Sequence, residues 1–270
     1  MDDKRFAVLI DADNISNKYA ELIFKEASNY GNVKIKRIYG DWSKADLASW
    51  RDTLLDHSIT PVQQFNYTTG KNSTDSAIII DAMDILFSKS VDGFCLVTSD
   101  SDFTRLVTRM RESDMYVVGM GEKKTPQPLV RACSEFKYLD VILRASEKNA
   151  KPKKPKKTVK KKGAEEEKAE PVKKEVKTEK ETVEDEKAAI VNLIKEIIDA
   201  DASDWLEISY LDALIKRRRP EFDFRVFGYK KMVQFFESLD SYGIIVKRVA
   251  DESNHKNFSQ RIYVGLNEEA

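Results

Sequence analysis

The sequence of 270 residues contains little cysteine and little histidine, with two residues of each. Cys95 and Cys133 lie in apolar segments and form no CxxC pair, which excludes the usual thiolate site for zinc. His57 and His255 are too few and too far apart to form a histidine-rich metal site. A metal site in this chain would therefore need other ligands.

Long apolar runs and net charge are also missing. No run of about 18 apolar residues occurs, so we predict no membrane span. No apolar signal segment follows the N-terminal residues 1–5, and we expect a soluble, cytoplasmic protein. The formal net charge is +0, but it combines a basic middle, residues 146–187, with two mildly acidic ends. This balance neither requires nor forbids a nucleic-acid partner.

Residues 1–145 alternate between apolar strands and helical segments about five times. The predicted strands are 6–10, 33–39, 60–67, 93–98, 115–120 and a short one at 136–139. The predicted helices are 17–30, 44–55, 76–87, a segment beginning near 103, and 129–133. The helix at 76–87 is inferred from the spacing of Ala77, Ile80, Met83, Asp84 and Phe87. This alternation predicts an α/β fold with a Rossmann-like, mostly parallel sheet.

Aspartates follow two of the predicted buried strands. Asp11 and Asp13 come after the first strand, and Asp100 and Asp102 come after the fourth. If the strand order is 3-2-1-4-5, these two strands are neighbours at the reversal of order, where such sheets bind ligands beyond their carboxyl ends. Asp75 begins the third predicted helix and is the fifth candidate. We therefore expect distant carboxylates to meet at one edge of the sheet.

Converging carboxylates repel one another unless a cation lies between them. Mg²⁺ and Mn²⁺ prefer oxygen ligands, and an ion held in this way can support phosphodiester hydrolysis. Asn14 could orient a carboxylate or contact a phosphate, Ser99 and Ser101 could hydrogen-bond a carboxylate, and Lys71 could pair with Asp75 or meet a phosphate. The alternative is helix capping, which is the better explanation for Asp75 or Asp102 taken alone, and Asp13 could simply serve the turn after the first strand.

From Ser146 the composition changes. Residues 148–162 contain nine lysines and no acidic residue, and residues 146–187 as a whole are too polar to form a core. We interpret 146–187 as a flexible charged linker, with a helical stretch near 175–187. Its basic half could hold a phosphate backbone electrostatically, or it could be a solvated tether with no partner.

Residues 188–270 have the pattern of a small second domain. Helices are predicted at 188–198, 210–216 and 227–239, and two strands of a hairpin at 243–246 and 260–264. Three helices followed by a β-hairpin predict a winged helix-turn-helix, which is a common nucleic-acid-binding shape.

With these residues identified, residues 5–140 resemble a NYN domain of the LabA type, a branch of the PIN-like nuclease superfamily. The resemblance is carried by Ile10–Asn14, by Lys71–Asp75 with Ile80–Asp84, and by Thr98–Phe103. It implies a Rossmann-like sheet and metal-dependent RNA cleavage. The acidic site that it implies comprises Asp11, Asp75, Asp100 and Asp102, with Asn14 beside the first. The family usually has glycine at the position of Ser99, whose β-carbon could narrow the site.

The C-terminal region resembles the OST-HTH/LOTUS winged helix. Pro220–Asp223, Phe227–Lys231 and Arg261–Val264 carry the resemblance, which implies RNA binding. The residues that we place at RNA are Arg217, Arg218, Arg219, Tyr229, Lys230 and Lys231.

The sequence therefore predicts a ribonuclease that depends on Mg²⁺ or Mn²⁺ and carries a tethered RNA-binding domain, with its oligomeric state left open. One alternative is a non-catalytic RNA-binding or regulatory adaptor with a vestigial acidic pocket. Another is a phosphatase of the haloacid dehalogenase type, because a strand followed by Asp-x-Asp also opens that site. Asn14 and Ile15 fit the phosphatase pattern poorly.

Overall fold

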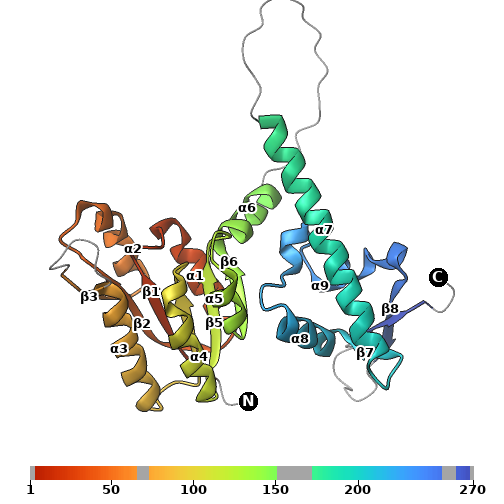
Figure 1. Cartoon of the computed structure of the whole chain (residues 1–270), viewed down its shortest axis with the longest axis horizontal. Helices are drawn as coiled ribbons and strands as arrows, with labels where there is room; N and C mark the ends of the chain where they lie inside the picture. Colours follow the sequence, from red (N-terminus) through yellow and green to blue (C-terminus); the bar gives the residue numbers. More distant parts are fainter. Residues whose placement is uncertain (1–3, 66–72, 151–171, 251–259, 268–270) are drawn as a thin grey trace, which may run out of the picture. The chain divides into compact units, whose positions relative to one another are not determined.

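The computed structural model describes residues 4–65, 73–150, 172–250 and 260–267 (Figure 1). The chain divides into two compact units, one of Met1–Arg144 with Lys216–Asp223 and one of Ala145–Ile215 with Phe224–Ala270. The domain limits predicted at residues 145 and 187 remain predictions, and residues 151–171 of the predicted linker lie outside the described residues.

The first unit is built on a six-stranded sheet in which every pairing is parallel. Its strands are β1 (Arg5–Asp11), β2 (Asn32–Gly40), β3 (Thr60–Gln63), β4 (Gly93–Val97), β5 (Tyr116–Gly121) and β6 (Glu135–Tyr138). The strand order is β3-β2-β1-β4-β5-β6, so the predicted order and the neighbouring positions of β1 and β4 are confirmed. The reversal of order therefore lies between the two strands that end in aspartates.

Helices cover both faces of this sheet (Figure 1). The helices are α1 (Ala20–Ala27), α2 (Arg51–Asp56), α3 (Ser73–Phe87), α4 (Thr104–Glu112), α5 (Gln127–Ala132) and α6 (Leu139–Ala150). Short 3-10 helices precede three of them, at Asn17–Tyr19, Ala45–Trp50 and Ser101–Phe103. The α/β class is confirmed, although the sequence did not predict helix α6.

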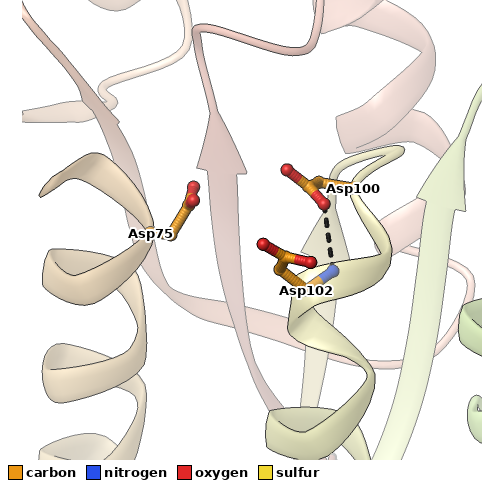
Figure 2. Close-up of side chains that lie close together, drawn as sticks. All are labelled: Asp75, Asp100 and Asp102. Carbon is orange, nitrogen blue, oxygen red and sulfur yellow. Dashed lines mark hydrogen bonds between the residues drawn. The ribbon is translucent and has the colours of Figure 1, made fainter. Parts of the chain in front are cut away.

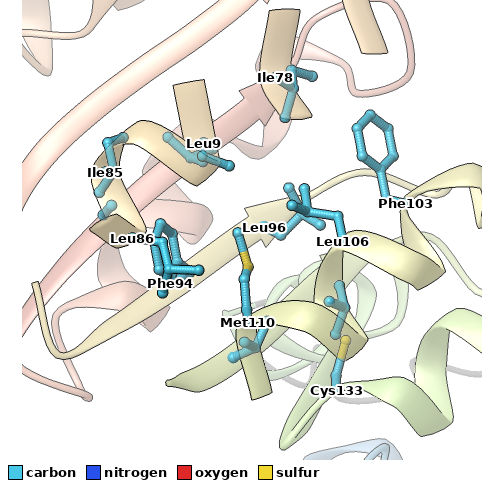
Figure 3. Close-up of a cluster of buried hydrophobic side chains, with 14 of the residues drawn as sticks. Leu9, Ile78, Ile85, Leu86, Phe94, Leu96, Phe103, Leu106, Met110 and Cys133 are labelled. Atoms are coloured by element: carbon cyan, nitrogen blue, oxygen red, sulfur yellow. The ribbon is translucent and has the colours of Figure 1, made fainter. Parts of the chain in front are cut away.

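Two hydrophobic cores hold the layers together. One core lies between the sheet and helices α3, α4 and α5, and Figure 3 shows part of it, including Leu9, Ile78, Leu96, Phe103 and Met110. The other core lies between the sheet and α1, the 3-10 helix Ala45–Trp50 and the start of α6. Because both faces are covered, β4 is buried along its whole length, as its continuous apolar sequence requires.

The third helix begins three residues earlier than predicted and buries a different face. Its buried apolar residues are Ile78, Ala82, Ile85 and Leu86. Two residues that carried the predicted spacing, Ile80 and Phe87, are exposed. The helix has apolar residues on both sides, so its spacing indicated a helix correctly but could not show which side is buried.

The C-terminal elements are α7 (Val172–Asp199), β7 (Trp205–Glu207), α8 (Ile208–Arg218), α9 (Met232–Glu237), β8 (Ile244–Ala250) and β9 (Gln260–Leu266). The strands form an antiparallel sheet in the order β7-β9-β8, which includes the predicted hairpin and the unpredicted β7. The helix predicted at 227–239 is shorter, because Gly228 has a positive φ of 86° and interrupts it. No helix in the described part of the chain is long and apolar enough to cross a membrane.

Candidate active site

The carboxyl ends of β1 and β4 place the acidic residues at one edge of the sheet. Asp11 is the last residue of β1, which pairs with β4 as far as Ile10 and Val97. Three residues beyond β4, Asp100 precedes the 3-10 helix that contains Asp102. The carboxylate of Asp100 accepts a hydrogen bond of 2.9 Å from the backbone N–H of Asp102 (Figure 2). This bond fixes the turn that presents both side chains.

Asp75 approaches the same place from the first turn of α3 (Figure 2). One carboxylate oxygen from each of Asp75, Asp100 and Asp102 lies within 4.8 Å of the others. Burial and the nearby charges of Asp100, Asp102 and Asp13 raise the pKa of Asp75 above its usual value. This set of hard oxygen donors, whose charges repel one another, fits a divalent cation such as Mg²⁺ or Mn²⁺.

Asp11 is separate from this group of three and lies deeper, with 1% of its surface exposed. Its two oxygens accept hydrogen bonds from the hydroxyl of Thr98, at 3.0 Å, and from the backbone N–H of Asp13, at 3.1 Å. Burial raises its pKa to about 6, opposed by its hydrogen bonds from Thr98 and Asn14 and assisted by the charge of Asp75. The charge of Asp75 therefore acts on Asp11, whose carboxylate is held by residues that directly follow β1 and β4.

Asp13 takes a different role from the other aspartates. Its carboxylate accepts a 2.9 Å hydrogen bond from the hydroxyl of Thr74, which is buried at the start of α3. The ammonium group of Lys44 lies 3.8 Å from its other oxygen. Asp13 thus ties the loop after β1 to the turn of α3 that carries Asp75.

Ser99 links the end of β4 to the end of β5 next to the acidic residues. Its buried hydroxyl accepts a 2.9 Å hydrogen bond from the backbone N–H of Glu122, just after β5. A β-carbon on the adjacent Gly121 would lie only 2.6 Å from the carbonyl oxygen of Thr98, so the two strand ends approach closely. Ser101 opens the 3-10 helix, and its carbonyl accepts from the hydroxyl of Thr104. Lys71 lies outside the described residues.

Sequence reasoning missed two groups beside the aspartates. Thr98 donates to Asp11 and accepts a 3.1 Å hydrogen bond from the backbone N–H of Asp100, so it links the ends of β1 and β4. Asp81 on α3 accepts hydrogen bonds from Arg37 and from Tyr39, both on β2. The sequence could have indicated this role, because Asp81 lies on the same side of α3 as the buried residues Ile78 and Ile85. A carboxylate on that side needs a hydrogen-bond partner.

The C-terminal candidates fall into two groups. Arg217 and Arg218 end α8 and Arg219 follows, and all three are exposed within the segment Lys216–Asp223. The other group is in the second unit, where Lys230 and Lys231 are exposed and the partly buried ring of Tyr229 packs edge-on against Phe235. The ammonium group of Lys187 lies 5.8 Å from the centre of the Tyr229 ring.

A parallel sheet with carboxylates gathered beyond its central strands defines an α/β domain with a candidate acidic metal site. The NYN domain model matches residues 5–140, which is half of the chain, and the chain therefore belongs to the NYN domain family. The OST-HTH/LOTUS domain model matches residues 181–249. The first match implies a PIN-like nuclease fold and the second suggests RNA binding. The LabA-type subfamily remains a prediction.

No curated protein matches the chain in sequence. A solved structure of a protein of unknown function from Vibrio parahaemolyticus is 20% identical with a TM-score of 0.43, and the match covers 50% of this chain and 91% of that one. The WlbA dehydrogenase from Bordetella pertussis, in complex with NADH and UDP-GlcNAcA, is 13% identical with a TM-score of 0.28, covering 55% of this chain and 41% of that one. Both TM-scores are too low for either likeness to inform the function.

Proposed function

We propose that the chain is a ribonuclease that uses Mg²⁺ or Mn²⁺ to hydrolyse RNA phosphodiester bonds. The observation that carries this proposal is the convergence of Asp75, Asp100 and Asp102 within 4.8 Å in a NYN domain. A bound divalent ion would supply positive charge that offsets the negative charge developing on the phosphate as water attacks. We also propose that the activity depends on the metal, that the ion is Mg²⁺ or Mn²⁺, and that the protein is cytoplasmic.

In this proposal the aspartates of the site have different roles. Asp75, Asp100 and Asp102 hold the ion, because their oxygens point toward one another from α3 and from the turn after β4 (Figure 2). Asp11, which is more deeply buried, adds negative charge near Asp75, and its two hydrogen bonds hold its carboxylate in place. The bond between Asp13 and Thr74 keeps the first turn of α3 beside the strand ends.

The OST-HTH/LOTUS match supports RNA as the substrate. We propose that Arg217, Arg218, Arg219, Lys230 and Lys231 contact phosphates, because all five are exposed cations. Tyr229 would stack on a base with the accessible part of its ring. Replacing these cations should weaken RNA binding and reduce its dependence on salt without altering the acidic site.

The decisive variant is Asp100→Asn, which keeps the size of the side chain and removes one charge. We expect RNA cleavage to be lost while the fold is retained, since Asp100 is only partly buried. The matched control is Asp84→Asn, because Asp84 is an exposed aspartate on α3 that the site does not use. Cleavage of labelled RNA and DNA should be followed with Mn²⁺ and with EDTA. Full activity of Asp100→Asn in the presence of Mn²⁺ would refute the assignment.

Calorimetric titration with Mn²⁺ separates this function from that of an RNA-binding adaptor. A nuclease of this kind should bind Mn²⁺ in the wild-type and Asp84→Asn proteins and lose most of that binding in Asp100→Asn. If RNA binds but Mn²⁺ binding is absent or independent of Asp100, the acidic site is vestigial and the adaptor is the better assignment.

A further inference from the structure

A partly buried polar group joins α3, the helix that carries Asp75, to β2. Asp81 accepts hydrogen bonds from the guanidinium group of Arg37 and from the hydroxyl of Tyr39. The ring of Tyr39 is fully buried, and the side chains of Arg37 and Asp81 are 36% and 22% exposed. Nothing in the sequence assigned a role to these residues.

The three side chains of this group satisfy one another's hydrogen-bonding atoms. Arg37 and Tyr39 are two positions apart on β2, so both side chains leave the sheet on the face that α3 covers. The buried hydroxyl of Tyr39 needs an acceptor on that face, because an unsatisfied buried polar group is costly, and Asp81 also pairs with the partly exposed guanidinium group of Arg37. Asp81 accepts both hydrogen bonds with a single carboxylate, which ties the position of α3 to that of β2.

Both ends of this contact lead to the acidic site. Tyr39 lies directly opposite Asp11 in the pairing of β1 and β2, and its carbonyl accepts a 3.0 Å hydrogen bond from the backbone N–H of Ala12. Asp81 lies six positions after Asp75 on the same helix, a rise of about 9 Å. A change in how α3 sits on β2 would therefore be transmitted through a stiff helix to Asp75.

We propose that Tyr39 and Asp81, with Arg37, are positioning residues that set α3 so that Asp75 meets Asp100 and Asp102 around the metal ion. This inference rests on the proposed function, because it concerns the same ion. Tyr39 and Asp81 do not touch the ion. They act through α3, and the bond between Thr74 and Asp13 provides the second attachment of that helix near Asp75.

The test compares two substitutions of the same kind in the full chain. Tyr39→Phe removes the hydroxyl that donates to Asp81. Tyr30→Phe is the matched control, because Tyr30 also donates to a buried carboxylate, at 2.9 Å, but its acceptor Glu135 is on β6. Mn²⁺ affinity by calorimetry and the midpoint of thermal unfolding in EDTA should be measured for both. These readouts do not depend on turnover.

We expect Tyr39→Phe to weaken Mn²⁺ binding by several-fold, which is less than the roughly 10–100-fold lost when a group hydrogen-bonded to a metal ligand is removed, because Tyr39 acts on Asp75 only through α3. Tyr30→Phe should lower the unfolding midpoint by a similar amount and leave Mn²⁺ binding unchanged. Asp81→Asn should also weaken Mn²⁺ binding, and combining it with Tyr39→Phe should cost less than the sum, because both changes break one contact. Asp81→Asn also serves as the test if Tyr39→Phe does not fold.

The outcomes separate this inference from the proposed function. If the wild-type protein binds Mn²⁺ and both Tyr39→Phe and Asp81→Asn bind it equally well, the positioning role is wrong and the nuclease proposal stands. If Tyr30→Phe weakens binding as much as Tyr39→Phe, the effect is general loss of stability and the inference is also overturned. If the wild-type protein binds no Mn²⁺, the proposed function fails first.

Discussion

Replacing Asp11 with asparagine should make the metal-free protein less sensitive to pH. Asp11 is buried, and burial is the largest reason that its pKa is raised from 3.8 to about 6. A carboxyl group with a raised pKa favours folding while it is protonated, below about pH 4, and this contribution is lost as the pH rises through about 6. The wild-type protein should therefore lose stability over that interval because of Asp11.

The size of the effect follows from the shift. A change from 3.8 to about 6 corresponds to about 3 kcal/mol. The substituted asparagine would carry no charge, but its amide nitrogen could not accept the hydrogen bond that Thr98 donates to the Asp11 carboxylate. Losing that bond costs about 1 kcal/mol. Asp11→Asn should therefore be slightly less stable than wild type at low pH and more stable, by about 2 kcal/mol, at neutral pH.

Urea unfolding in EDTA at about pH 4 and about pH 7.5 measures both differences, and EDTA removes the contribution of bound metal. Other acidic residues titrate in both proteins, so the difference between the two proteins isolates position 11. A difference in the free energy of unfolding that stays constant between the two pH values would refute the argument. It would mean that the carboxylate of Asp11 ionises in the folded protein as easily as in the unfolded chain.

Two further substitutions test the hydroxyl groups of Ser99 and Thr98, which form hydrogen bonds next to Asp100 and Asp11. Ser99→Ala should destabilise the fold by about 1–3 kcal/mol in urea unfolding, because the backbone N–H of Glu122 loses its acceptor. Its Mn²⁺ affinity should change little, and a large loss would show that the hydroxyl belongs to the metal site. Thr98→Val should destabilise by a similar amount, and more at about pH 7.5 than at about pH 4, since ionised Asp11 loses a donor. Equal destabilisation at both pH values would contradict the role given to that hydroxyl.

The sheet could be predicted from the sequence because its strands carry two independent signals. The strands β1 and β4 are continuously apolar, as strands covered on both faces must be, and each is followed by a turn with two aspartates. The strand order 3-2-1-4-5, which was assumed as one that such parallel sheets adopt and which the structure has, brings together residues about ninety positions apart. Local pattern and topology agree here, which is why residues 5–140 were identified with the fold that the structure has.

Helix α3 shows where local pattern is insufficient. Apolar residues at positions 78, 82, 85 and 86 face the core, yet Ile80 and Phe87 are as apolar and face outward. Spacing at three to four residues fits either side of such a helix. The polar residue Asp81 distinguishes the sides, because it has partners only on the sheet that the helix covers. The role of Asp81 depends on its hydrogen bonds with Arg37 and Tyr39, which lie more than forty positions earlier in the sequence. Only the tertiary structure brings these residues together.

The roles of the aspartates were likewise beyond the sequence. Spacing treats Asp11, Asp75, Asp100 and Asp102 as equivalent ligands. The structure separates Asp11, since two hydrogen bonds occupy its buried carboxylate, from three side chains whose oxygens converge. The hydrogen-bond donors around a carboxylate determine whether it can turn toward an ion, and those donors come from Thr98 on the neighbouring strand end and from the following turn. A sequence motif therefore predicts which residues gather at the edge of the sheet, whereas the division into ligands and supports that we propose depends on hydrogen bonds that the motif does not contain.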